Sequence, residues 1–101
     1  MFRGKQSITL QHEIGITQNA VGETEPAWSE EETVIAAVYP MSNTQEAKEY
    51  GRLPSEIRRV LVNLKADARL GDKAVIDGNV YRVRNLMRHR THQELTAVLE
   101  V

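Results

Sequence analysis

The sequence predicts a mainly β protein, a small antiparallel β-barrel of about six strands with one short helix and a long loop near the N-terminus. Two observations support this fold class. Short segments rich in β-branched residues recur along the 101 residues, with turn residues between them. Only one stretch has the composition of a helix. A chain of this length has room for a single core, so residues 1–101 are expected to form one domain.

The N-terminal part is expected to contain two strands and a loop. Within residues 6–14, Ile8 and Leu10 alternate with polar neighbours, which is the period of a half-buried strand. Residues 15–32 are rich in small and polar side chains and are interpreted as a long loop that is free to move. Residues 33–39 are a β-branched run that is typical of a buried strand, and Pro40 ends it.

The only predicted helix follows Pro40. Ser42 can cap its first turn, and Gly51 provides a left-handed stop. Most of the residues between them are good helix formers. Pro54 then separates this helix from a long central strand over residues 55–65.

The C-terminal third is expected to form consecutive antiparallel strands. Residues 73–76 and 79–90 flank Asp77-Gly78, a dipeptide that favours a tight hairpin turn. A last strand is expected over 93–101. A loop at 91–93 would place Arg88 opposite Thr96 and Arg84 opposite Glu100, with apolar side chains sorted to the other face.

Charge is unevenly distributed along the chain. Residues 1–51 carry three basic and eight acidic side chains, whereas residues 52–101 carry ten basic and six acidic ones. Such a separation suits copies or neighbours that meet through unlike surfaces. The alternative is chance variation in a solvated surface.

The sequence offers no case for catalysis. The absence of cysteine excludes disulfides, thiolate zinc sites and cysteine nucleophiles. His89 and His92 span an expected turn and lack the spacing of a metal site. Glu30–Glu32 is interpreted as a solvated charge run. We therefore expect no enzyme activity, no metal and no cofactor. Without an apolar run long enough to cross a bilayer, we also expect a soluble protein that does not contact membranes.

Four arginines share one parity on one predicted strand and are candidate phosphate contacts, because an unbroken strand would point them to a single face. In the alternative interpretation, Glu94 and Glu100 neutralise two of them across the hairpin. The rival function from a different class is therefore a small-barrel nucleic-acid-binding module, although few aromatic residues are available to stack on bases. The four residues are Arg82, Arg84, Arg88 and Arg90.

Several segments together resemble the head–tail adaptor (head closure, or head–tail joining) proteins of tailed bacteriophages. These are the run from Val34 to Ser42, the acidic short helix with Tyr50-Gly51-Arg52, and the strand from Glu56 to Val62. The aspartate-initiated strand and Asp-Gly turn from Gly71 to Val83 match the most recognisable part, and Glu94 to Glu100 fits the closing strand. The resemblance covers residues 33–101 and, more loosely, the opening strand.

This resemblance implies a β-barrel with long protruding loops whose copies form a ring, a dodecamer or hexamer, beneath the portal. The ring would join the DNA-filled capsid to the tail and help retain the genome. Its implied partners are other copies, portal or adaptor proteins and tail proteins, with DNA only passively near and no membrane. Its implied location is the neck of the virion, assembled in the cytoplasm of a bacterial host. A tail-completion or tail-terminator protein is the nearest alternative.

Candidate interface residues follow from the loop and the charge separation. Trp28, the only tryptophan, is a candidate anchor on a polar loop. The alternative is that it forms a lid over the open end of the barrel. Acidic candidates lie on the loop and the helix, and basic candidates follow the helix. They are Glu30, Glu31, Glu32, Glu46 and Glu49, with Arg52, Arg58 and Arg59 as the complementary charges.

Overall fold

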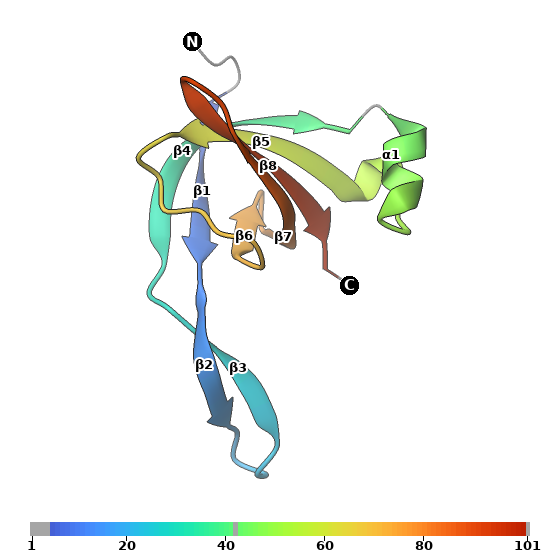
Figure 1. Ribbon diagram of the computed structural model, residues 1–101. Coiled ribbons are helices and arrows are strands. Elements are labelled where there is room, and N and C mark those ends of the chain that lie inside the picture. Colours follow the sequence, from blue (N-terminus) through green and yellow to red (C-terminus); the bar gives the residue numbers. More distant parts are fainter. Residues whose placement is uncertain (1–4, 42, 101) are drawn as a thin grey trace.

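The computed structural model describes residues 5–41 and 43–100, which form a closed β-barrel from which a two-stranded arm projects (Figure 1). Every barrel strand is antiparallel to its neighbours, which confirms the predicted fold class. In spatial order the strands are β1 (Lys5–Gln11), β4 (Glu32–Pro40), β5 (Ile57–Asn63), β8 (His92–Leu99), β7 (Asn79–Arg88) and β6 (Lys73–Ile76).

The barrel interior is filled by apolar side chains at alternate positions of its strands. Because successive strand residues point to opposite faces, Val60 and Val62 of β5 face inward together with Leu95 and Ala97 of β8. Ile8 and Leu10 of β1 belong to the same buried cluster, as their alternation in the sequence predicted. The interior is therefore a packed core.

A second, smaller apolar cluster lies between the outer side of the barrel and helix α1 (Thr44–Glu49). Ala47 of the helix is fully buried there against Ile57 and Val98. The side chain of Asn43 accepts a hydrogen bond from the Glu46 amide at 3.1 Å, so Asn43 is the N-cap. The predicted cap, Ser42, lies outside the described residues. Gly51 has φ +68, which confirms the left-handed stop.

The predicted turn between β6 and β7 is also confirmed. Asp77 and Gly78 have φ values of 51 and 80, as a type I′ hairpin turn requires. The single turn of 3-10 helix η1 (Pro54–Glu56) precedes β5 and begins at a proline, whose fixed φ suits that position.

The predicted register between β7 and β8 is wrong. Arg88 lies opposite Gln93, and a β-bulge between Val83 and Asn85 shifts the register further along the pair. The bulge inserts one extra residue, Arg84, into β7, which reverses the inward and outward alternation beyond it. Val83 faces the core before the bulge and Leu86 after it.

The predicted loop over residues 15–32 is a β-hairpin along most of its length, and this corrects the sequence-based interpretation. Strand β2 (Glu13–Gln18) pairs with β3 (Thr24–Trp28) in a sheet separate from the barrel. We call residues 13–28 the arm. It extends from one end of the barrel, whereas the turn between β7 and β8 lies at the other end (Figure 1).

Candidate interaction site at the arm and its root

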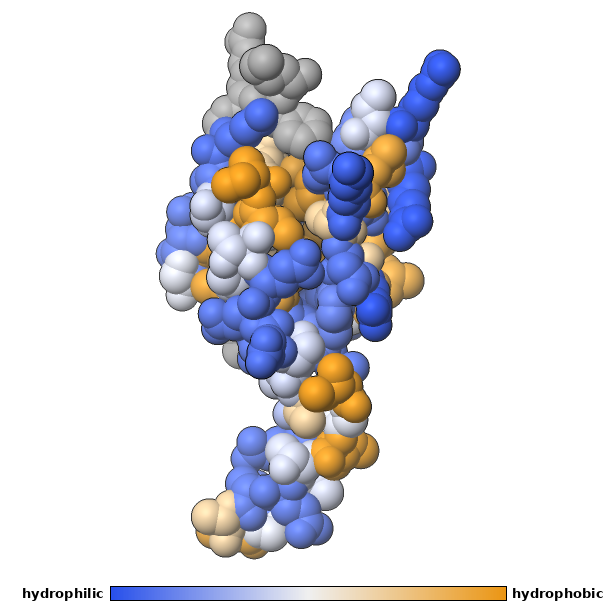
Figure 2. All heavy atoms as spheres, turned by 90° about the vertical axis from the view of Figure 1, so that its left-hand side faces the viewer, coloured by the Kyte–Doolittle hydropathy of each residue, from blue (hydrophilic) through white to orange (hydrophobic). Residues whose placement is uncertain are grey.

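The arm exposes apolar side chains that no part of its own barrel covers. Ile14 is 68% exposed and Ile16 is 76% exposed. Ile16 lies opposite Pro26 on the partner strand, and Ile14 lies at an irregularity of the pairing between Glu13 and Gly15. Val21 in the turn of the arm is 77% exposed. Figure 2 shows hydrophobic groups exposed on the projecting arm among hydrophilic ones.

A tight turn joins the two strands of the arm. Asn19 accepts hydrogen bonds through its side-chain oxygen from the amides of Val21 and Glu23, at 3.1 and 3.0 Å. Gly22 has φ +85 and donates its amide to the Asn19 carbonyl at 3.0 Å. Asparagine and glycine suit these positions because one binds the turn backbone and the other tolerates positive φ.

The two strands of the arm are joined at its root by hydrogen bonds between His12 and Ser29. The His12 amide donates to the Ser29 hydroxyl oxygen at 2.9 Å, and the Ser29 amide donates to the His12 carbonyl at 2.8 Å. Gln11 adds a side-chain hydrogen bond to the Ser29 carbonyl at 3.0 Å. The hydroxyl of Ser29 donates in turn to the Glu30 carbonyl at 3.2 Å. The chain therefore leaves and re-enters the barrel at one fixed point.

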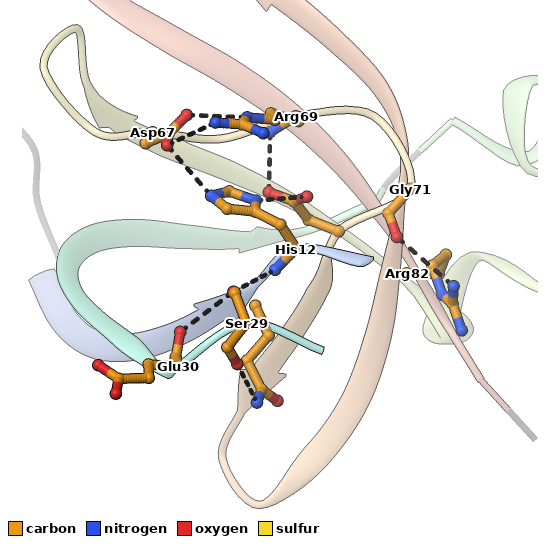
Figure 3. A network of polar contacts seen from close by, with 9 residues as sticks. His12, Ser29, Glu30, Asp67, Arg69, Gly71 and Arg82 are labelled. Carbon is orange, nitrogen blue, oxygen red and sulfur yellow. Dashed lines mark hydrogen bonds and ion pairs between the residues drawn. The ribbon is translucent and has the colours of Figure 1, made fainter. Parts of the chain in front are cut away.

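The ring of His12 ties this point to the segment between β5 and β6 (Figure 3). Its Nδ1 lies 2.8 Å from Oδ1 of Asp72, and its Nε2 lies 3.2 Å from Oδ2 of Asp67. Asp72 is buried at 2% exposure and also accepts the Arg69 amide at 2.8 Å. A neutral imidazole has only one N–H, so only the protonated ring can donate to both carboxylates. We call these four residues and Ser29 the root cluster.

Arg69 completes the root cluster from the solvent side. Its guanidinium donates to both carboxylate oxygens of Asp67, at 3.1 and 3.0 Å. These hydrogen bonds lower the pKa of Asp67, with a smaller opposing effect of burial and further lowering by the charges of Arg69 and His12. The same pair raises the pKa of Arg69. Fixed charges therefore surround the root of the arm.

Trp28, the last residue of β3, is half-buried against two cations of its own chain. Its ring lies under Lys73 Nζ at 4.5 Å and Arg82 Cζ at 4.8 Å from the ring centre. Lys73 and Arg82 are cross-strand partners on β6 and β7, flanked by residues that face the core. Trp28 therefore braces the arm against the outer side of the barrel, and the interpretation of a lid over its open end is wrong. Cation–π contacts of this kind add to the attachment.

The arm and its flanks are strongly acidic. Residues 12–32 contain no lysine or arginine, and none of their carboxylates takes part in the ion pairs found within residues 5–41 and 43–100. Of the predicted interface acids, Glu30 and Glu31 lie between β3 and β4, and Glu32 begins β4; all three are exposed. The full set of glutamates is Glu13, Glu23, Glu25, Glu30, Glu31 and Glu32.

Three of the other predicted interface residues, Glu46, Arg52 and Arg59, form ion pairs within the chain. Arg59 binds Glu46 of α1 at 2.9 Å and Glu94 of β8 at 2.8 Å. Arg52 lies 3.9 Å from Glu56 in the next turn. The pair of Arg59 with Glu46 attaches the helix to β5 of the barrel.

Arg58 and Glu49 differ from those pairs. Arg58 donates to the carbonyls of Ser55 and Ile57 and lies over the ring of Tyr81 at 5.8 Å. Glu49 ends the helix with an exposed side chain.

The four candidate phosphate-binding arginines do not share one face, because the bulge at Arg84 interrupts the alternation of β7. Arg82 points outward and binds Glu100 at 2.7 Å. Arg88 lies beyond the bulge opposite Gln93, and Arg90 lies in the turn that follows β7. Glu100 thus neutralises one of the four, while Glu94 binds Arg59 instead.

Sequence reasoning missed the root cluster. His12 and Asp72 lie 60 residues apart, and no local spacing connects them. The arm left a weak local signal, since Ile14 and Ile16 alternate with polar residues and Asn19 to Gly22 is a turn sequence. Within the described ranges no group of three or more His, Cys, Asp or Glu is placed to hold a metal ion. The helices there are too short and too polar to cross a bilayer.

The described architecture is therefore that of a small closed barrel with a hairpin arm, and solved structures have a similar fold. Comparison with protein-family models finds no match, and no curated protein is significantly similar in sequence. Protein SF1141 from Shigella flexneri 2a is similar at TM-score 0.70 and 21% identity, over 100% of this chain and 98% of that chain. The phage-like element PBSX protein xkdH from Bacillus subtilis is similar at TM-score 0.63 and 18% identity, over 95% of this chain and 94% of that one. At these identities the likeness establishes the fold.

Proposed function

We propose that this chain is a non-enzymatic structural protein of a tailed bacteriophage or prophage. Its copies form a ring that joins the portal side of the capsid to the tail and helps retain the packaged DNA. Its site would be the neck of the virion, reached by assembly in the cytoplasm of the bacterial host. The proposal requires no cofactor and no membrane contact, and DNA would pass near the ring without being gripped.

The observation that carries the proposal is the arm. Two antiparallel strands alone are marginally stable in water, yet this hairpin holds Ile14 and Ile16 in solvent on a fixed root. Burial of an isoleucine side chain contributes about 1.5–3 kcal/mol, which this monomer leaves unused at both positions. A rigidly attached, partly apolar projection is what an assembling subunit needs to contact a neighbour.

Two further observations support a structural role. The charges of the arm are unpaired within residues 5–41 and 43–100, so they are available to a partner of opposite sign. The fold is also shared by a protein of the phage-like element PBSX, over nearly the full length of both chains. The position in the neck of the virion is inferred from the sequence resemblance to head–tail adaptor proteins.

Deletion of the gene from the phage or prophage that encodes it tests this function. We expect electron microscopy of the resulting particles to show DNA-filled heads and free tails that do not join, together with heads that have lost DNA. A plasmid copy of the gene should restore complete particles. Joined particles with tails of abnormal length would indicate a tail-completion or terminator protein instead. Normal particles would overturn the proposal.

A further inference from the structure

The two ends of this molecule carry opposite charges that its own residues leave uncompensated. At one end are the six glutamates of the arm and its flanks. At the other end, Arg88 ends β7 and Arg90 lies in the turn that leads to β8 (Figure 1). We call residues 88–90 the basic turn. Arg88 and Arg90 are exposed, and neither forms an ion pair with any residue the structure describes.

Among the described residues, no carboxylate forms an ion pair with Arg88 or Arg90 of the basic turn. Glu94 is the closest acidic residue along β8, and it already binds Arg59 at 2.8 Å. Its other carboxylate oxygen lies 3.5 Å from Nε2 of His89. The basic turn therefore presents two arginines that are free to bind an external acidic group.

Both ends also expose apolar side chains. The arm exposes Ile14, Ile16 and Val21, as described above. Beside the basic turn, Met87 is 49% exposed and Leu64 is 39% exposed. The Leu64 carbonyl accepts the side-chain amide of Gln93 at 3.3 Å, which holds this segment next to the start of β8. The two surfaces are thus complementary in charge and alike in apolar character.

We propose that the arm of one copy docks on the basic turn of a second copy. The inference rests on the proposed function only in that it expects the chain to assemble with itself. The arm cannot reach the basic turn of its own molecule, because the two lie at opposite ends of a body 45 Å long. A contact between unlike surfaces is heterologous, so its repetition generates a ring when the rotation closes.

The charges disfavour an arm-to-arm dimer as the alternative. Two arms in contact would bring together six carboxylates, those of Glu13, Glu23 and Glu25 from each copy, with no lysine or arginine among residues 12–32 of either. Like charges at an interface disfavour association. The head-to-tail arrangement instead places every acidic arm against arginines.

Cross-linking between engineered copies tests the contact. Because the sequence contains no cysteine, a thiol reagent can react only with the introduced cysteines. One copy carries Val21→Cys in the turn of the arm, and the other carries Thr91→Cys beside the basic turn. A short bis-maleimide reagent then reports their proximity. The charge-reversed arm is Glu23→Lys with Glu25→Lys, and the charge-reversed turn is Arg88→Glu with Arg90→Glu. Lys48→Glu, on the exposed side of α1, is the matched control.

We expect efficient cross-linking between unmodified arm and unmodified turn. Reversal of either side alone should lower the yield about tenfold or more, because like charges then face each other. Reversal of both sides should restore it, and the control should change nothing. High salt should weaken the contact by screening.

Failure to restore the cross-link with both sides reversed would overturn the proposal. So would a cross-link confined to pairs of Val21→Cys copies, or none at any protein concentration. This outcome is separable from failure of the proposed function, because the deletion phenotype is measured in particles. Unjoined heads and tails without the arm-to-turn cross-link would leave the connector function standing and remove only this contact.

Discussion

At the scale of single residues, the attachment of the arm depends on the buried carboxylate of Asp72. It accepts hydrogen bonds from the His12 ring and the Arg69 amide, and it is 2% exposed. We expect Asp72→Ala to lower the free energy of unfolding by about 1–3 kcal/mol, since both donors lose a buried partner. Urea denaturation measures this loss. Amide hydrogen exchange in β2 and β3 should accelerate, because the root no longer fixes their position.

Asp67 provides the matched control for Asp72, since it contacts the same ring from the solvent side. Its side chain is 53% exposed, so Asp67→Ala should change the free energy of unfolding little. Equal losses for the two variants would show that the buried hydrogen bonds at Asp72 are not what holds the root.

The ion pair of Asp67 with Arg69 makes a distinct expectation about pH. Hydrogen bonds from Arg69 lower the pKa of Asp67 below its ordinary value of 3.8. A lowered pKa means that the pair stabilises the fold above that value and that this contribution is lost as pH falls through the lowered pKa. Carboxyl NMR titration should show Arg69→Gln raising the pKa of Asp67. Lys48→Gln, on helix α1 away from the pair (Figure 1), should leave it unchanged; an unchanged pKa in Arg69→Gln would remove Arg69 as the cause.

Some individual residues could be predicted from the sequence, and the reason is local chemistry. Gly51 and Asp77-Gly78 adopt positive φ, a need that glycine and aspartate signal by themselves. His12 and Asp72 could not be predicted as a pair, because only the closed barrel brings them together. Trp28 was recognised as unusual, but its contacts with Lys73 and Arg82 also require the three-dimensional fold.

At the scale of elements, the barrel strands were predictable because one face of each is buried. Alternation in β1 follows from that burial. The run over residues 33–39 does form strand β4, but the expectation of a strand buried on both sides is wrong, because only Ala36 and Ala37 are buried and Ile35 is 55% exposed. Every residue of β2 is exposed, so the strand has no buried face and its sequence shows no clear hydrophobic periodicity. The sequence of the arm therefore predicts a loop. Its pairing depends instead on the Asn19–Gly22 turn and on the root cluster.

The bulge in β7 explains why the predicted arginine face and the predicted register both failed. A strict period of two assigns Arg82 and Arg88 to one side, and a single inserted residue at Arg84 separates them. The composition signal at the site is weak: Asn85 belongs to a residue type depleted in strands, and its side-chain oxygen accepts a hydrogen bond from the Leu86 amide at 3.0 Å. The error therefore arises from backbone geometry that side-chain patterns do not encode.

At the scale of the whole molecule, the uneven charge of the sequence becomes a separation in space. The acidic N-terminal half places six glutamates on or beside the arm, and the basic C-terminal half places Arg88 and Arg90 at the other end. Ion pairs within the chain, such as that of Arg59 with Glu46, neutralise part of the predicted interface charge. In the proposed contact, the unpaired glutamates of the arm would face Arg88 and Arg90 of a second copy.

Removal of the arm tests whether it serves assembly alone. No residue of β2 or β3 belongs to either buried apolar cluster. Glu13 and Trp28 are directly paired, so an Asn-Gly turn can replace residues 14–27 and keep the root cluster intact. We expect this variant to unfold in urea with a free energy equal to or slightly above that of the full chain, because a shorter connection costs less closure entropy.

The same variant should lose self-association and the ability to complete particles. Leu95→Ala, at a fully buried position of the barrel core, calibrates the measurement, since such a truncation costs about 2–5 kcal/mol. A loss of that size in the armless variant would mean that the arm stabilises the barrel and that its exposed surface is secondary. Retained stability with lost assembly would mean that the barrel is a self-sufficient carrier and that Ile14, Ile16 and the arm glutamates act only between copies.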